Sequence, residues 1–216
     1  PCPVAEPLRD CARSRIDGTG CRARPADEPA ISPADKSAQS AATTGDRRPT
    51  PQETDPAAKL LIEAKMPLMI DGDEIYKAKA VPKAVKLAEL LGMPVTQARQ
   101  MFANFPEPHP LWVGGLPAGT PNSITWPKHA DVVINVGNKM QHNSPQPIVP
   151  RNKKFIDMRI DHWSMGNVML TEVPLVADAS HGLDDLIVAV EQLLTPALKQ
   201  RFTERADEVK KFTTQA

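Results

Sequence analysis

Short runs of consecutive apolar residues are the feature that most constrains the fold of this chain. They are MPLMIDGD (66–73), MPVTQAR (93–99), ADVVINVG (130–137), KKFIDMRID (153–161) and EVPLVAD (172–178). Strands that are apolar on both faces are typical of a parallel sheet covered by helices on each side. The runs therefore predict a doubly wound, Rossmann-like α/β fold.

Segments with helical periodicity lie between these runs. Residues 55–64 are predicted to form a helix, with Asp55 as the N-cap and Pro56 at the first helical position, where a missing N–H costs nothing. Further helices are predicted over 75–92 and 180–194, where apolar residues recur at helical spacing, and Pro82 either breaks the first of them or begins its main body. This alternation of strand and helix supports the parallel sheet.

Composition divides the chain into three parts. Residues 1–54 are rich in Pro, Ala, Arg and Ser, contain all three cysteines and lack apolar periodicity, so we expect a disordered or non-native tail. Residues 55–194 are the expected domain, and 195–216 the expected terminal helix and tail, capped by Thr195. The Arg, Ala and Pro content of residues 1–54 and their clustered cysteines could reflect a natural tail, but we favour a truncated or frame-shifted message.

Charge and hydropathy exclude several classes of partner. Lysine plus arginine equals aspartate plus glutamate at 26 each, so no net field attracts nucleic acid or a membrane surface. No apolar run is long enough to cross a bilayer, and the first residues do not resemble a secretion signal. We expect a soluble, cytoplasmic protein.

Four of the predicted strands end in residues that suit a ligand site. Gly72 and Gly137 would let a backbone approach a ligand closely, and Asp161 and Asp178 could accept a ribose hydroxyl. Glycine and aspartate are also common turn residues, so a purely structural role stays open. No dinucleotide fingerprint, P-loop, calcium loop or metal-spaced histidine pair occurs, and no catalytic residue or metal ligand is predicted.

The long segment 101–130 is dense in proline and glycine and carries Trp112 and Trp126. A connection of this length in a compact domain is often functional or contacts a partner. We expect one of these two roles.

An ordered set of motifs resembles one protein family. AKLLIEAKMPLMIDGDE, AVKLAELLGMPV, FPEPHPLWVGG, ADVVINVG, KFIDMRID and VADASHGLDDLIVAV occur in the order characteristic of the central domain of thiamine-diphosphate-dependent enzymes. Acetolactate synthase, benzoylformate decarboxylase and oxalyl-CoA decarboxylase are the most similar groups. The resemblance covers about residues 55–194.

The resemblance implies a six-stranded parallel domain between two thiamine-binding domains. Thiamine diphosphate and Mg²⁺ would be held by the pyrimidine-binding and diphosphate-binding domains, whose motifs this chain lacks. The chain would be a fragment, inactive alone, of a homo-oligomeric enzyme that decarboxylates or joins 2-oxo acids. With the strand-end residues, the candidate cofactor-binding residues are Gly72, Gly114, Gly115, Gly137, Asp161 and Asp178.

The resemblance also bears on the bound nucleotide. The central domain carries FAD in acetolactate synthases, a nucleotide in oxalyl-CoA decarboxylases and nothing in several decarboxylases. This chain has 71–74 where flavin-binding members have a glycine run, and 138–141 where they have Arg-Phe-Asp-Asp. Arg159 and Asp161 replace paired acids of the family. These departures argue against FAD, and another nucleotide stays open.

Two alternative functions remain. The chain could be a free-standing NAD- or FAD-binding α/β protein, since one topology serves many functions. It could also be an interaction module that uses segment 101–130.

Overall fold

The structure is a computed structural model that describes residues 47–97, 101–115, 126–140 and 149–215. The chain divides into two compact units, Pro1–Ala42 and Thr43–Ala216, and every described residue belongs to the second. Most of the predicted tail 1–54 therefore lies outside the described residues. The described elements are α2 (Pro51–Glu63), β1 (Pro67–Asp71), α3 (Asp73–Lys77), α4 (Val81–Leu91), β2 (Val95–Gln97), β3 (Trp112–Gly115), α5 (Trp126–His129), β4 (Val132–Val136), β5 (Lys154–Arg159), η1 (His162–Ser164), β6 (Val173–Val176), α6 (Ala179–Leu193) and α7 (Pro196–Gln215).

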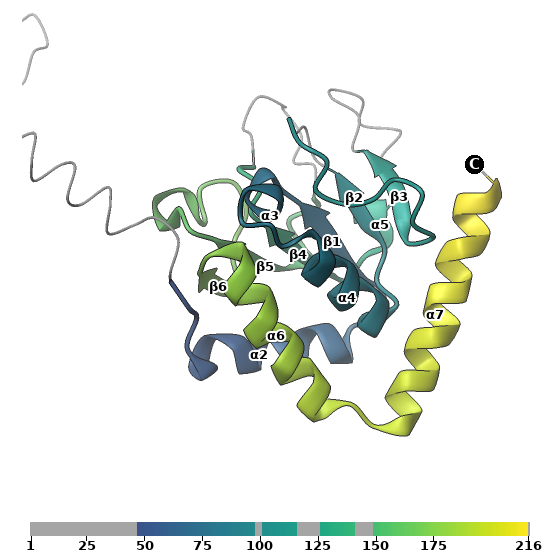
Figure 1. The fold of residues 1–216 in the computed structure, drawn as a ribbon. Helices are drawn as coiled ribbons and strands as arrows, with labels where there is room; N and C mark the ends of the chain where they lie inside the picture. Colours follow the sequence, from purple (N-terminus) through teal and green to yellow (C-terminus); the bar gives the residue numbers. More distant parts are fainter. Residues whose placement is uncertain (1–46, 98–100, 116–125, 141–148, 216) are drawn as a thin grey trace, which may run out of the picture. The chain divides into compact units, whose positions relative to one another are not determined.

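Six parallel strands form one sheet in the order β3-β2-β1-β4-β5-β6 (Figure 1). The chain builds outward from β1 through β2 to β3, then returns to place β4 on the other side of β1. Pro67 pairs with Val132 and Asp71 with Val136 along this central contact. The predicted doubly wound parallel fold is confirmed, and its switch point lies between β1 and β4.

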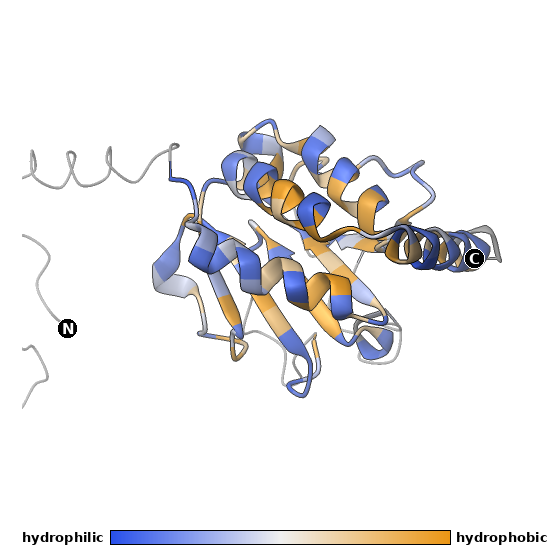
Figure 2. Ribbon diagram, turned by 90° about the horizontal axis from the view of Figure 1, so that it is seen from below, coloured by the Kyte–Doolittle hydropathy of each residue, from blue (hydrophilic) through white to orange (hydrophobic). Residues whose placement is uncertain are grey.

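The two faces of the sheet have different coverings. On one face, α6 packs against α2 and α4, and α7 packs against α4, over the larger apolar core. On the other, a smaller core lies beneath α5 and loop residues. Figure 2 shows apolar residues concentrated in the central strands and polar residues on the outer turns of the helices. The smaller core consists of Leu68, Ile70, Ala130, Val133, Met140, Val149, Phe155 and Met169.

The first described helix begins earlier than the sequence predicts. Thr50 precedes α2, and its backbone N–H donates to the Glu53 side chain over 2.7 Å. Asp55 and Pro56 lie inside the helix, so the predicted N-cap at Asp55 is wrong. The Thr50–Glu53 pair satisfies a donor at the helix start, which explains why the helix begins five residues earlier than predicted.

Segment 101–130 contributes to the fold itself. Trp112 begins the edge strand β3, which the residue pattern alone did not predict and which the family resemblance implied only as a sixth strand. Trp112 and Trp126 are half-buried and pack against the larger core, and the Trp126 ring meets Phe212 edge to face. Residues 116–125 lie outside the described residues.

The terminal helix α7 begins as predicted. The Thr195 hydroxyl accepts the Leu198 amide over 3.3 Å, and Phe202 and Val209 are buried in the larger core. Arg201 and Arg205 donate to backbone carbonyls at the end of α2, and burial lowers the pKa of Arg205 to about 10. Among the described residues, no helix is long and apolar enough to cross a membrane.

Candidate functional site

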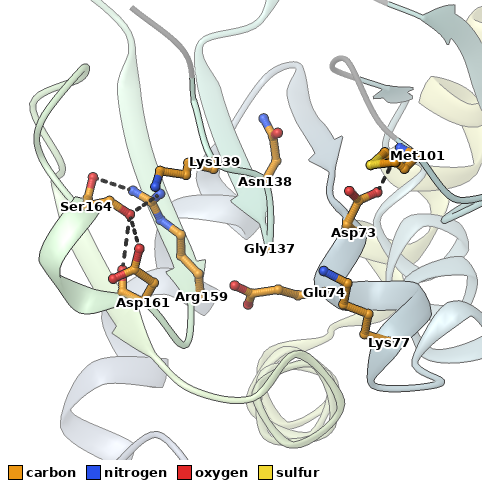
Figure 3. A pocket seen from close by; sticks show the side chains of 10 residues that line it. All are labelled: Asp73, Glu74, Lys77, Met101, Gly137, Asn138, Lys139, Arg159, Asp161 and Ser164. Atoms are coloured by element: carbon orange, nitrogen blue, oxygen red, sulfur yellow. Dashed lines mark hydrogen bonds between the residues drawn. The ribbon is translucent and has the colours of Figure 1, made fainter. Parts of the chain in front are cut away.

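A cleft of about 440 Å³ lies at the carboxyl end of the sheet, where β1 and β4 are neighbours. Ligands of open parallel sheets bind at this switch point, because the connections leave in opposite directions there. The lining comes from Arg159 at the end of β5, from the segments that follow β1, β4 and β5, and from Met101 in the segment after β2 (Figure 3). The charged lining residues are Asp73, Glu74, Asp161, Lys77, Lys139 and Arg159.

Two glycines allow the turns after β1 and β4 to touch beside this cleft. A Cβ atom on Gly72 would lie 2.1 Å from backbone atoms of Gly137 and Asn138. Gly137 has φ of +66°, and a Cβ atom there would lie 2.4 Å from the Cβ of Glu74. Neither position can carry a side chain unless the backbone shifts. Close contact within the chain therefore accounts for both strand-end glycines.

Glu74 reaches across the switch point. Its amide donates to the Gly137 carbonyl over 3.4 Å, and its Oε2 accepts the Ile160 amide over 3.1 Å. Burial raises the pKa of this carboxyl, while the Ile160 hydrogen bond and the charge of Arg159 oppose the rise. One residue, through its backbone amide and its carboxylate, thus connects the ends of β1, β4 and β5, and its carboxyl binds a proton more readily than that of an exposed glutamate.

A buried polar network joins β4 to β5 beside the cleft. Arg159 Nη2 donates to Asp157 Oδ2 over 2.5 Å, and Asn135 Nδ2 donates to Asp157 Oδ1 over 2.8 Å. Asn135 Nδ2 also donates to the Asn138 carbonyl over 2.8 Å. Burial raises the pKa of Asp157, and the hydrogen bonds from Arg159 and Asn135 oppose the rise. These charge-assisted bonds fix the ends of both strands.

Arg159 also positions the loop after β5. Its Nη1 donates to Ser164 Oγ over 2.9 Å, and its Nη2 donates to the Ser164 carbonyl over 2.8 Å. Ser164 Oγ in turn donates to Asp161 Oδ2 over 2.7 Å, and this bond holds the pKa of Asp161 below its usual range. Asp161 is therefore an anion at neutral pH on the wall of the cleft (Figure 3).

The chemistry of the lining suits a polar ligand. Its charged residues are three acids and three bases, so acceptors and donors are equally represented. Such a lining favours a molecule that uses both kinds of hydrogen bond over a bare anion. Among the residues that the structure describes, no cluster of three or more His, Cys, Asp or Glu could hold a metal ion.

The six candidate cofactor-binding residues fall in different places. Gly137 and Asp161 line the cleft, and Gly72 lies directly behind Gly137. Asp178 Oδ1 accepts the Ser180 amide at the start of α6 over 2.8 Å, and its charge adds to the raised pKa of Glu74. The other two, Gly114 and Gly115, end the edge strand β3 and are not among the lining residues of the cleft.

The sequence did not single out Glu74, Lys77, Lys139 or Ser164 as site residues. For Glu74 a signal was available, because it stands two positions after the glycine that ends the first predicted strand. In phosphate-binding sheets of this kind, that position belongs to the anion-binding turn. An acid there is a departure that points to a special role.

Two curated proteins share part of this sequence. The chain is 34% identical over 134 residues to a sulfoacetaldehyde acetyltransferase of Castellaniella defragrans. The aligned region covers 59% of this chain and 22% of the relative. It is 29% identical over 143 residues to the acetolactate synthase large subunit of Corynebacterium glutamicum, which covers 64% of this chain and 23% of the relative. The chain thus spans less than a quarter of the length of these two relatives.

Solved structures share the fold. The thiamine diphosphate-dependent 4-hydroxybenzoylformate decarboxylase of Rhodococcus jostii RHA1 matches with a TM-score of 0.59 and 26% identity, over 65% of this chain and 27% of that one. Benzoylformate decarboxylase from Polynucleobacter necessarius matches with a TM-score of 0.61 and 22% identity, over 67% and 28% respectively. The second likeness shows the fold alone.

A protein-family model identifies the family to which the chain belongs. The model described as thiamine pyrophosphate enzyme, central domain, matches residues 54–186. This range is more than half of the chain and contains all six strands of the sheet. The chain therefore belongs to the thiamine pyrophosphate enzymes, and residues 54–186 are a central domain of that family.

Proposed function

We propose that this chain is the central, non-catalytic part of an acetolactate synthase-like enzyme that decarboxylates or joins 2-oxo acids. The observation that carries the proposal is the match of residues 54–186 to the central domain alone, together with coverage of less than a quarter of the two curated relatives. The pyrimidine-binding and diphosphate-binding domains would be its partners, and the complete enzyme would be a homo-oligomer.

The lining of the cleft supports assigning thiamine diphosphate and Mg²⁺ to those partner domains. A diphosphate needs cationic or metal-bridged contacts. At the cleft, α3 has only five residues and carries Asp73 and Glu74 in its first turn, and the described part of the chain offers no metal-ligand cluster. The described residues do not fit this cofactor.

The extent of the domain follows from packing. Residues 51–54 are the first turn of α2, and Phe202 and Val209 of α7 are part of the larger core. We propose that the structural unit runs from α2 through α7. The terminal helix then belongs to the same unit as the matched region.

The direct test is the DNA on either side of the coding sequence. We expect reading frames for a pyrimidine-binding domain upstream and a diphosphate-binding domain downstream. Flanking frames that are unrelated to thiamine enzymes, in an otherwise complete gene, would contradict the proposal.

A second test uses the purified chain. Calorimetric titration with thiamine diphosphate and Mg²⁺ should give no saturable binding at millimolar ligand, and pyruvate should not be consumed. Saturable binding, or turnover of pyruvate above a heat-denatured control, would show that the chain carries its own thiamine site.

A further inference from the structure

We propose that Glu74 determines the specificity of the switch-point cleft by closing it to nucleotides and other phosphate-bearing ligands, while neutral polar ligands can still enter. This inference goes beyond the proposed function. It concerns what the cleft of this chain admits and does not depend on the reaction of any larger enzyme.

The first argument is the place that the Glu74 carboxylate occupies. In doubly wound sheets, free backbone amides at the carboxyl ends of the strands receive the phosphates of a ligand. Here Oε2 of Glu74 already accepts the Ile160 amide at the end of β5. The chain's own anion therefore takes a donor that a phosphate would use.

The second argument is that Glu74 is held in this place. Its Cβ lies where a side chain on Gly137 would have to be, and its amide contacts the Gly137 carbonyl. The preceding turn is fixed by the backbone contact of Gly72 with Gly137 and Asn138. For the Glu74 carboxylate to move aside, the side chain would have to give up the Ile160 amide.

The third argument is the electrostatic balance that a phosphate would meet. Asp73 lies in the same turn, where its Oδ1 accepts the Met101 amide over 3.2 Å and the Asn104 side chain over 3.3 Å. Arg159 is engaged by Asp157 and Ser164, and Lys77 and Lys139 are exposed. A diphosphate would face the carboxylates of Asp73, Glu74 and Asp161 and only solvated lysines, and like charges at close range disfavour binding.

The test compares ADP with adenosine, because the two differ in charge and share the nucleoside. Calorimetric titrations would use the full chain, Glu74→Ala, Glu74→Gln and the control Glu63→Ala, an exposed acid at the end of α2. We expect the unmodified chain and the control to bind ADP no more tightly than adenosine. In Glu74→Ala, ADP affinity should rise at least tenfold while adenosine affinity changes less than threefold.

Glu74→Gln keeps the shape of the side chain and removes its charge, so it carries the test if the alanine variant does not fold. It should shift the ratio of ADP to adenosine affinity in the same direction, by at least threefold. The proposal is overturned if the unmodified chain binds ADP tenfold more tightly than adenosine. It is equally overturned if a variant with native circular dichroism shows no gain for ADP.

Discussion

Two carboxylates connect neighbouring segments of the sheet, Asp131 at the amino end and Glu74 at the carboxyl end, and their pKa values are shifted in opposite directions. At the amino end, Asp131 accepts the amides of Lys65 over 2.7 Å and of Met66 over 2.9 Å, and also that of Val132 over 3.0 Å. At the carboxyl end, Glu74 accepts a single amide across the strands. Burial acts to raise the pKa of both, but the backbone hydrogen bonds of Asp131 outweigh it and lower that pKa.

The difference shows how each end of the sheet is used. Backbone N–H groups take the place of water around the Asp131 carboxylate and stabilise its charge. This charge therefore contributes to the stability of the fold. At Glu74, by contrast, burial disfavours the charged form. Groups with a disfavoured charge collect in functional clefts more often than at purely structural contacts. The comparison assigns stability to the amino end and selectivity to the carboxyl end.

The largest expected effect comes from removing Arg159. Arg159→Ala should destabilise the chain by about 4 kcal/mol, because Asp157 is left buried without its cation. Urea unfolding of the two proteins measures the loss. Adding Asp157→Asn should recover part of it, since no uncompensated charge then remains. Equal stabilities for Arg159→Ala and the unmodified chain would show that the carboxyl-end network is not structural.

The next effect tests the backbone contact behind the cleft. Gly72→Ala should cost about 3 kcal/mol, because the new Cβ meets backbone atoms that cannot rotate away. Gly115→Ala is the matched control, because the nearest atom to a Cβ there lies 3.7 Å away. Thermal unfolding followed by circular dichroism distinguishes them. A similar loss in both variants would mean that the contact is not the cause.

Asp131→Ala tests the structural role of the carboxylate at the amino end of the sheet. It should destabilise the chain by about 2 kcal/mol, because the Lys65 and Met66 amides lose their acceptor near the start of β1. Asp131→Asn, which keeps one oxygen, should lose less. Urea unfolding at neutral pH gives both values, and an alanine variant as stable as the parent would remove the structural role of this carboxylate.

The smallest effect is the pH dependence of Glu74→Gln, whose stability at neutral pH should differ from that of the parent by less than about 1 kcal/mol. The raised pKa means that the contribution of Glu74 is fully present below the usual glutamate pKa and is lost as pH rises through the folded-state pKa. For Asp131, with its lowered pKa, the contribution is present above the usual aspartate pKa and is lost as pH falls through the folded-state pKa.

Urea unfolding at a series of pH values checks these signs. Relative to the parent, Glu74→Gln should gain stability as pH rises above about 4.3, the usual pKa of glutamate. The difference in stability between Asp131→Asn and the parent should shrink as pH falls below about 3.9, the usual pKa of aspartate. If the stability of both variants differed from that of the parent by the same amount at every pH, the opposite pKa shifts of the two carboxylates would be wrong.

Much of the fold could be predicted because its central strands are buried on both faces. β1 and β4 are fully buried, and their sequences are apolar except for Asp71 and Asn135. The edge strand β3 is only partly buried and ends in two glycines, so its sequence has neither a run nor an alternation. The start of α2 was missed although Thr50 and Glu53 have the spacing of a capping box.

The site was predictable only where a residue ends a strand. Gly137 directly follows β4, and Asp161 lies two positions after the end of β5, so the strand prediction located both. Glu74 enters the cleft through a hydrogen bond with Ile160, which is far from it in sequence, whereas Ser164 is held by Arg159, only five residues away. The Glu74 contact depends on the register of β1, β4 and β5, so the position of Glu74 after Gly72 can mark it as unusual but cannot identify its partner.

The pairing of β1 with β4 also has a consequence for the time course of folding. Pro67 meets Val132 only after the segment that forms α3, α4, β2 and β3 has closed into a large loop. Contacts between distant residues form slowly, because the entropy of loop closure opposes them before any contact compensates. We therefore expect the contact of Gly72 with Gly137 to form late, so that the cleft is completed only when the two halves of the sheet have joined.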